Sequence, residues 1–204
     1  MIMAIDSSTR LDRREVVKAL LRERGEMLVI AGLGAPSWDA AAAGDVPLNF
    51  PLWGGMGGAV AIGLGLAIAQ PKRPVLVLTG DGELLMGLGS LATVGVYKPA
   101  NLSIVVLDNE RYGETGMQNS HTAAGGVNLA AVAVACGMER SSLVTRMDQV
   151  GALCKDLHSM QGPWLAQIKV ATDKLPLVMP PRDGTHLKNR FREALLGPEA
   201  HHQK

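Results

Sequence analysis

Short runs of mostly apolar residues recur along the chain, and segments of helical length separate them. The runs cover residues 27–31, 74–79, 102–107 and 164–170, and the first of them is apolar throughout. Largely apolar runs of this length are typical of strands that are buried on both faces, as in parallel sheets covered by helices. The sequence therefore predicts an α/β fold, a single three-layer domain with a central, mainly parallel sheet and right-handed crossovers.

The segments between these runs show helical patterns. We expect helices over about residues 11–22, 56–69, 84–96, 129–136, 147–160 and 185–196, and a short strand at 143–144. Residues 108–126 read as one long polar loop. A proline-rich stretch precedes the last, basic helix.

Composition excludes several classes of protein. Hydrophobic residues make up 47% of the 204 residues, which is too many for a disordered chain. Lys and Arg number 20 against 19 Asp and Glu, so no basic surface for nucleic acid is indicated. The most apolar stretch, residues 59–69, is shorter than a membrane span, and the first 14 residues lack a signal-peptide core. We expect a cytoplasmic protein without nucleic-acid or membrane partners, in which Cys136 and Cys154 are free thiols.

Polar or glycine-rich segments follow three of the predicted strands, at the edge where parallel sheets bind ligands. They begin at Gly34, Gly80 and Asp108. The glycines of Gly80-Asp81-Gly82 would let the backbone approach a phosphate, and Asp81 beside a phosphate suggests Mg²⁺. Taken alone, this triplet is a common turn sequence. Asn109, at the end of the next strand, could supply a second oxygen ligand and favours the metal site.

Gly80-Asp81-Gly82, followed about thirty residues later by Asp108-Asn109, resembles the thiamine-diphosphate-binding motif of thiamine-dependent enzymes. That motif usually ends in paired asparagines, and here Asp108 replaces the first of them. The resemblance implies thiamine diphosphate and Mg²⁺ as cofactors. It implies metal ligands at Asp81, at Asn109 and at the carbonyl of Arg111.

A second resemblance lies upstream, in Trp53-Gly54-Gly55-Met56-Gly57. In the family this segment supplies a bulky apolar residue, here Met56, that holds the cofactor in its bent conformation. A helix start with a core methionine is the simpler alternative for this segment taken alone. Together the two motifs imply a cofactor-binding set of Gly34, Ala35, Gly54, Met56, Gly80, Asp81, Gly82, Glu83, Asn109, Tyr112 and Gly113.

Over roughly residues 11–170, the sequence resembles the small subunits of sulfopyruvate and phosphonopyruvate decarboxylases. It implies the cofactor-binding subunit of a non-oxidative 2-oxo-acid decarboxylase, which releases an aldehyde and carbon dioxide. Two alternatives stay open. One is a thiamine-dependent enzyme for another 2-oxo acid, and the other is a non-catalytic regulatory module that keeps the thiamine-diphosphate site.

Thiamine enzymes of this type need one domain for the diphosphate and one for the aminopyrimidine. The length of this chain suits only the first, which we place at residues 1–175, with residues 176–204 as a proline-rich segment and helical tail. Glu26 precedes a predicted strand and is badly placed to activate the cofactor. No catalytic residue is therefore assigned on this chain. We expect the activating glutamate on a separate pyrimidine-binding subunit, in a hetero-oligomer with two or more copies of the chain.

The polar loop supplies the residues expected to face substrate, Thr115, Gln118 and His121. For His121, a solvated loop histidine is an equally good interpretation. Gly63-Leu-Gly65 could suggest a dinucleotide-binding fingerprint, but its third glycine is missing and the pair lies within a helical pattern. Close packing of a helix is the better interpretation of these glycines.

Overall fold

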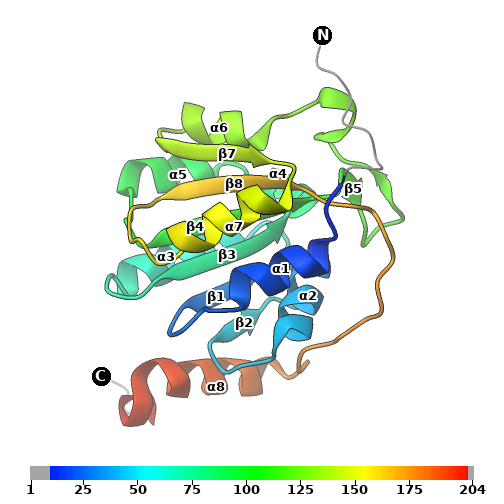
Figure 1. Ribbon diagram of the computed structural model, residues 1–204. Helices are drawn as coiled ribbons and strands as arrows, with labels where there is room; N and C mark the ends of the chain where they lie inside the picture. The colour runs from blue at the N-terminus through cyan, green and yellow to red at the C-terminus, as the bar shows by residue number, and fades with distance from the viewer. Residues whose placement is uncertain (1–9, 202–204) are drawn as a thin grey trace.

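A computed structural model describes residues 10–201, so residues 1–9 and 202–204, at the ends of the two predicted regions, lie outside the described residues. Its main sheet has six strands in the order β2-β1-β3-β4-β8-β7, and every neighbouring pair is parallel (Figure 1). The strands are β1 (Leu28–Ala31), β2 (Asn49–Pro51), β3 (Val75–Gly80), β4 (Leu102–Asp108), β7 (Arg140–Val144) and β8 (Trp164–Lys169).

Helices cover both faces of this sheet, as Figure 1 shows. One layer contains α1 (Arg13–Leu21), α2 (Ala35–Ala43) and α7 (Met147–Asp156). The other contains α3 (Ala59–Ala69), α4 (Asp81–Met86), α5 (Ser90–Tyr97) and α6 (Leu129–Ala135). The predicted three-layer α/β fold with a mainly parallel sheet is thus confirmed.

Successive side chains of the central strands point to opposite faces, which explains why the runs are apolar along most of their length. In β1, Leu28 and Ile30 pack in the core below α3, whereas Val29 and Ala31 pack in the core below α1 and α2. A polar residue at any of these positions would lie in one of the two cores. Strands of this kind therefore cannot show the alternating pattern of a half-exposed sheet.

The prediction of one helix over residues 84–96 is wrong. The chain forms α4 and α5 instead, with a break after Met86. At Gly87 a Cβ atom would lie only 1.9 Å from the backbone oxygen of Gly57, so this position has no room for a side chain. The loop that begins at Trp53 therefore packs against the segment before α5, where the backbones of Gly57 and Gly87 lie in close contact.

Further differences concern short elements. The sequence did not predict α2 or the edge strand β2, and helix α3 begins three residues later than expected. Residues 108–126 are not a plain loop, because β5 (Arg111–Tyr112) and β6 (Gln118–Asn119) form an antiparallel hairpin. A short 3₁₀ helix, η2 (Ala123–Gly125), follows this hairpin.

The chain after β8 runs along one side of the molecule and ends in α8 (Gly184–Leu196) and a short 3₁₀ helix, η3 (Gly197–His201) (Figure 1). Helix α8 lies beside the edge strand β2, where the rings of Phe191 and Phe50 have centroids 5.4 Å apart. On the way, the carbonyl of Pro181 accepts a hydrogen bond of 2.7 Å from the indole of Trp53. In the part of the chain that is described, no helix has the length and apolar character needed to cross a membrane.

The order of the strands fixes where a ligand can bind. From β1 the chain goes to β2 on one side, and it then returns to β3 on the other side of β1. The loops that leave β1 and β3 therefore diverge toward opposite faces of the sheet. A crevice forms beyond the carboxyl ends of strands at such a switch point, and this is where open α/β sheets bind their ligands.

Candidate functional site

An open cleft with about 600 Å³ of empty space lies at this switch point. The segments that follow β1, β3 and β4 form its walls. It brings together most of the residues predicted for the site, namely Ala35, Met56, Gly80, Asp81, Gly82, Glu83, Asn109, Arg111, Tyr112, Gly113 and Thr115.

Four predicted residues do not line this cleft: Gly34, Gly54, Gln118 and His121. Gly34 has a φ of +82°, which favours glycine, and a Cβ there would lie 2.3 Å from Oε1 of the cleft residue Glu114. The absence of a side chain at Gly34 therefore leaves room for Glu114, which lines the cleft. Gln118 exchanges hydrogen bonds of 3.0 Å with the cleft residue Thr115, and Gly54 precedes the cleft residue Met56 by two positions.

The exposed His121 lies behind Tyr112. Its Nδ1 is 3.0 Å from the hydroxyl oxygen of Tyr112, and the two rings meet edge to face with centroids 6.2 Å apart. The Tyr112 ring in turn packs on Gly82, where a Cβ atom would lie 2.6 Å from the ring. Gly82 is thus required by the packing of Tyr112. At Gly80, by contrast, a Cβ would meet no atom within 4 Å, so the backbone there faces open space.

Asp81 is the first residue of α4 and has only 1% of its surface exposed. One carboxylate oxygen accepts a short hydrogen bond from the hydroxyl of Ser120 and lies 3.2 Å from the hydroxyl of Thr122. Burial and the nearby charge of Asp108 raise the pKa of Asp81 to about 6. Within residues 10–201, no lysine or arginine forms an ion pair with this carboxylate. A buried carboxylate of this kind is a suitable ligand for a divalent cation.

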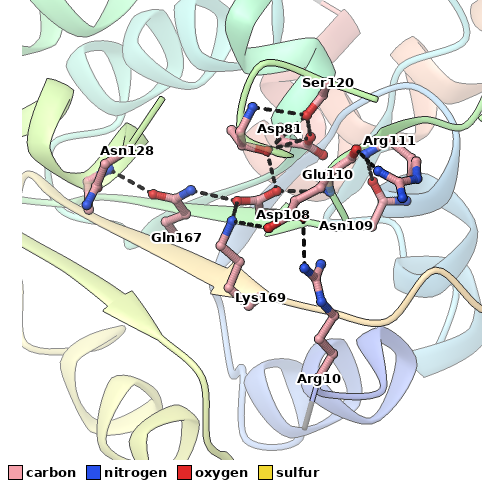
Figure 2. A network of polar contacts seen from close by, with 12 residues as sticks. Arg10, Asp81, Asp108, Asn109, Glu110, Arg111, Ser120, Asn128, Gln167 and Lys169 are labelled. Carbon is pink, nitrogen blue, oxygen red and sulfur yellow. Dashed lines mark hydrogen bonds and ion pairs between the residues drawn. The ribbon is translucent and has the colours of Figure 1, made fainter. Parts of the chain in front are cut away.

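Asn109 and Arg111 lie in a tight turn directly after β4 (Figure 2). The carboxylate of Asp108 accepts a hydrogen bond of 3.0 Å from the N–H of Glu110, and the amide oxygen of Asn109 accepts one of 2.9 Å from the N–H of Arg111. Between them, Glu110 has a φ of +60°, which a non-glycine residue adopts only when its surroundings hold it there. The turn therefore places Asn109 and the backbone of Arg111 at the cleft.

Behind this turn lies a buried polar network (Figure 2). The carboxylate of Asp108, which is fully buried, accepts hydrogen bonds from Nζ of Lys169 and Nε2 of Gln167, both at 2.6 Å. Lys169 also forms an ion pair of 2.9 Å with Glu110. The hydroxyl of Thr122 lies 2.7 Å from the carboxylate of Asp108, and so joins this network to Asp81.

This network explains how the chain accommodates an acid where the thiamine motif usually has an asparagine. Lys169 neutralises Asp108 from the neighbouring strand β8. Burial raises the pKa of Glu110, but hydrogen bonds from Lys169 and Arg10 outweigh this effect and hold its pKa below the usual value. Both acids that flank Asn109 are therefore paired with cations.

Glu83 lies at the back of the cleft with 4% of its surface exposed. It accepts a hydrogen bond of 2.8 Å from the hydroxyl of Thr79, and it packs so closely on Gly32 that a Cβ there would lie 1.7 Å from its carboxylate. Burial raises the pKa of Glu83, although the hydrogen bond from Thr79 opposes this shift.

The sequence did not predict several residues that form or support the cleft. Apolar members of the wall are Leu33, Pro36, Leu107 and Val170, and a polar member is Arg13. Glu114 also lines the cleft and belongs to the polar loop that was expected to face substrate. The supporting residues Ser120, Thr122, Gln167 and Lys169 were missed because they come from distant segments. Gln167 and Lys169 did leave a signal, since they are polar residues within an apolar strand.

Comparison with known proteins adds to this geometry. Residues 41–168 match the family described as thiamine pyrophosphate enzyme, C-terminal TPP binding domain. The chain is 35% identical over 187 residues to the sulfopyruvate decarboxylase subunit beta of Methanothermobacter thermautotrophicus, a match that covers 92% of this chain and 97% of that subunit.

Two further matches concern longer proteins. The phosphonopyruvate decarboxylase of Streptomyces viridochromogenes is 35% identical over 196 residues, which is 95% of this chain but only 49% of that enzyme. The chain thus spans about half the length of this relative. The solved structure of the thiamine diphosphate-dependent 4-hydroxybenzoylformate decarboxylase of Rhodococcus jostii RHA1 has a TM-score of 0.66 at 19% identity. The match covers 86% of this chain and 35% of that one, and it supports the same fold.

Proposed function

The chain belongs to the family of thiamine pyrophosphate enzymes and contains their C-terminal TPP binding domain, and on this premise we propose that it is the cofactor-binding subunit of a 2-oxo-acid decarboxylase. The names of the relatives favour sulfopyruvate or phosphonopyruvate as substrate, with an aldehyde and carbon dioxide as products. One observation carries the proposal: the buried Asp81 has no cationic partner among the described residues and lies beside Asn109 and Arg111 in the cleft at the switch point.

Mg²⁺ fits this part of the site. Asp81 would supply a carboxylate oxygen, Asn109 an amide oxygen and Arg111 a backbone carbonyl, and Mg²⁺ takes oxygen ligands of these kinds. The diphosphate of the cofactor would complete the ligand set. The open space beside the Gly80 backbone leaves room for that group.

When bound, thiamine diphosphate supplies a thiazolium ring that takes up the electron pair left by the departing carboxylate. The residues of this chain hold and shield that ring. Met56, Leu33 and Val170 give the cleft apolar walls, which reduce hydration of the substrate carboxylate and so favour its loss. Thr115 lines the cleft and is proposed, with Gln118 and His121 behind it, to contact the substrate or its products.

We also propose that a separate subunit binds the aminopyrimidine and supplies the activating glutamate. The relative named as a beta subunit supports this arrangement, because the chain covers nearly all of it. Exposed apolar side chains on α3 and α5, among them Ile68 at 49% and Val96 at 80%, are residues that such a partner could cover. In this scheme residues 1–175 bind the cofactor and residues 176–204 are appended to that domain.

The test is to isolate the chain with the subunits that co-purify from its native host and to measure carbon dioxide release. Sulfopyruvate, phosphonopyruvate and pyruvate are offered in turn, with thiamine diphosphate and Mg²⁺ present. We expect release from one of the first two, its loss in Asp81→Asn, and normal release in the control Asp45→Asn. Asp45 pairs with Arg190 of α8, and neither residue lines the cleft. Release from pyruvate alone would contradict the substrate, and cofactor binding without release would favour a regulatory module.

A further inference from the structure

Lys169 is a buried cation that the proposed chemistry does not use. It is the last residue of β8, and 7% of its surface is exposed. Taking a lysine out of water is unfavourable unless a paired charge compensates it. Here two carboxylates do so, Asp108 at 2.6 Å and Glu110 at 2.9 Å, and these residues stand immediately before and after Asn109 (Figure 2).

The turn that carries Asn109 needs such support. Glu110 adopts a φ of +60°, a backbone conformation that is unfavourable for a non-glycine residue. The Glu110 side chain is held from two sides, by Lys169 and by an ion pair of 2.8 Å with Arg10. The position of Asn109 is therefore fixed through its two neighbours, because its own side chain only closes the local turn to Arg111.

The same lysine acts toward Asp81 through Asp108. Without a cation, the Asp108 carboxylate would face the carboxylate of Asp81 across the shared hydroxyl of Thr122, which lies 2.7 Å from the first and 3.2 Å from the second. Two such buried charges repel each other, and one of the side chains would turn away. Lys169 thus keeps Asp108 in place and leaves Asp81 as the carboxylate directed at the cleft.

We propose that Lys169 is a positioning residue for the metal-binding turn, acting through its simultaneous ion pairs with Asp108 and Glu110. Its positive charge balances the negative charge of Asp108, which stands where the thiamine motif usually has an asparagine. Because Arg10 also forms an ion pair with Glu110, that carboxylate keeps one cation without Lys169, so Lys169 should be essential only while residue 108 is an acid. This inference rests on the proposed function, since it concerns how the same site holds its metal.

The test measures binding without relying on turnover. The full chain, purified with any subunit that accompanies it, is titrated with Mn²⁺ in the presence of thiamine diphosphate, and free Mn²⁺ is followed by electron paramagnetic resonance. Thermal unfolding in EDTA is recorded in parallel. The variants are Lys169→Met, Asp108→Asn and the double variant, and Lys98→Met serves as the control. Lys98 pairs with Glu139 at 3.3 Å on the surface.

We expect Lys169→Met to weaken Mn²⁺ binding by about 10- to 100-fold, as loss of a residue that orients metal ligands does. The double variant should recover to within about threefold of wild type, and Lys98→Met should not change binding. A lower unfolding temperature of Lys169→Met with unchanged Mn²⁺ affinity would overturn the inference, because the role would then be structural only.

Two other outcomes would also decide the matter. Should Lys169→Met not fold, the double variant decides: wild-type binding supports the inference, and weak binding overturns it. If wild type binds no thiamine diphosphate with Mn²⁺ or Mg²⁺, the proposed function fails and this inference fails with it. Normal binding by wild type and Lys169→Met alike overturns the inference alone.

Discussion

The two glycines of α3 allow a paired test of how this helix packs on the sheet. At Gly63, which is buried, a Cβ atom would lie 2.2 Å from Cγ2 of Val77 in β3. Carbon atoms pack at about 3.5–4.0 Å, so the helix or the strand would have to move by more than 1 Å. Val77 is fully buried and β-branched, and cannot turn aside easily. At Gly65, which is exposed, a Cβ would meet no atom within 4 Å.

Gly63→Ala and Gly65→Ala both gain about 1 kcal/mol of helix propensity, which cancels when the two variants are compared. The remaining difference is the cost of overpacking, about 3 kcal/mol at the upper end of the usual range because the clash is severe. Urea unfolding should therefore show Gly65→Ala slightly more stable than wild type and Gly63→Ala less stable. Equal stability of the two variants would refute the close packing of α3 on β3 and reopen a ligand-binding role for these glycines.

Three further predictions concern the rest of the chain. Asp39 is fully buried and paired with two arginines of α1, so Asp39→Asn should lower the free energy of unfolding by about 3 kcal/mol in urea, and a loss below about 1 kcal/mol would contradict this pairing. Trp53→Phe removes the hydrogen bond to Pro181 and should cost about 1 kcal/mol in the same assay, whereas no loss would mean that the C-terminal segment does not hold Trp53. Because burial raises the pKa of Asp81 from 3.8 to about 6, the folded metal-free protein binds more protons than the unfolded chain between these values. Stability in EDTA should then fall as pH rises from about 4 to 6, by at most about 3 kcal/mol, and Asp81→Asn should remove this slope; an unchanged slope would assign it to another group.

The sequence predicted the central strands well because each is buried on both faces and most of its residues are apolar. It did not predict α2 and β2, for physical reasons that their residues make clear. Helix α2 is nine residues long, has Pro36 in its first turn and shows little amphipathic character, and β2 is a three-residue edge strand that ends in Pro51. The break between α4 and α5 depends on the approach of Gly57 to Gly87, a tertiary contact that no local pattern contains.

For the site, the ends of β3 and β4 could be predicted because parallel strands place their carboxyl ends at one edge. Asp81 and Asn109 were found in this way, and the cleft contains both. Their support could not be found, since Thr122 and Lys169 reach the site from a loop and from a strand that are far away in the sequence. The acid at position 108 could not be explained from the sequence either, because its partner Lys169 is brought beside it only by the pairing of β4 with β8.

The most direct test of the account is a calorimetric titration of the protein, purified with any subunit that accompanies it, with thiamine diphosphate in the presence and absence of Mg²⁺, for wild type and Asp81→Asn. The account predicts binding that requires Mg²⁺ and that becomes weaker by about a hundredfold or more in the variant, because a buried metal ligand is lost. Binding that does not depend on Mg²⁺, or that is equally strong in Asp81→Asn, would contradict the assignment of the cleft as the cofactor site.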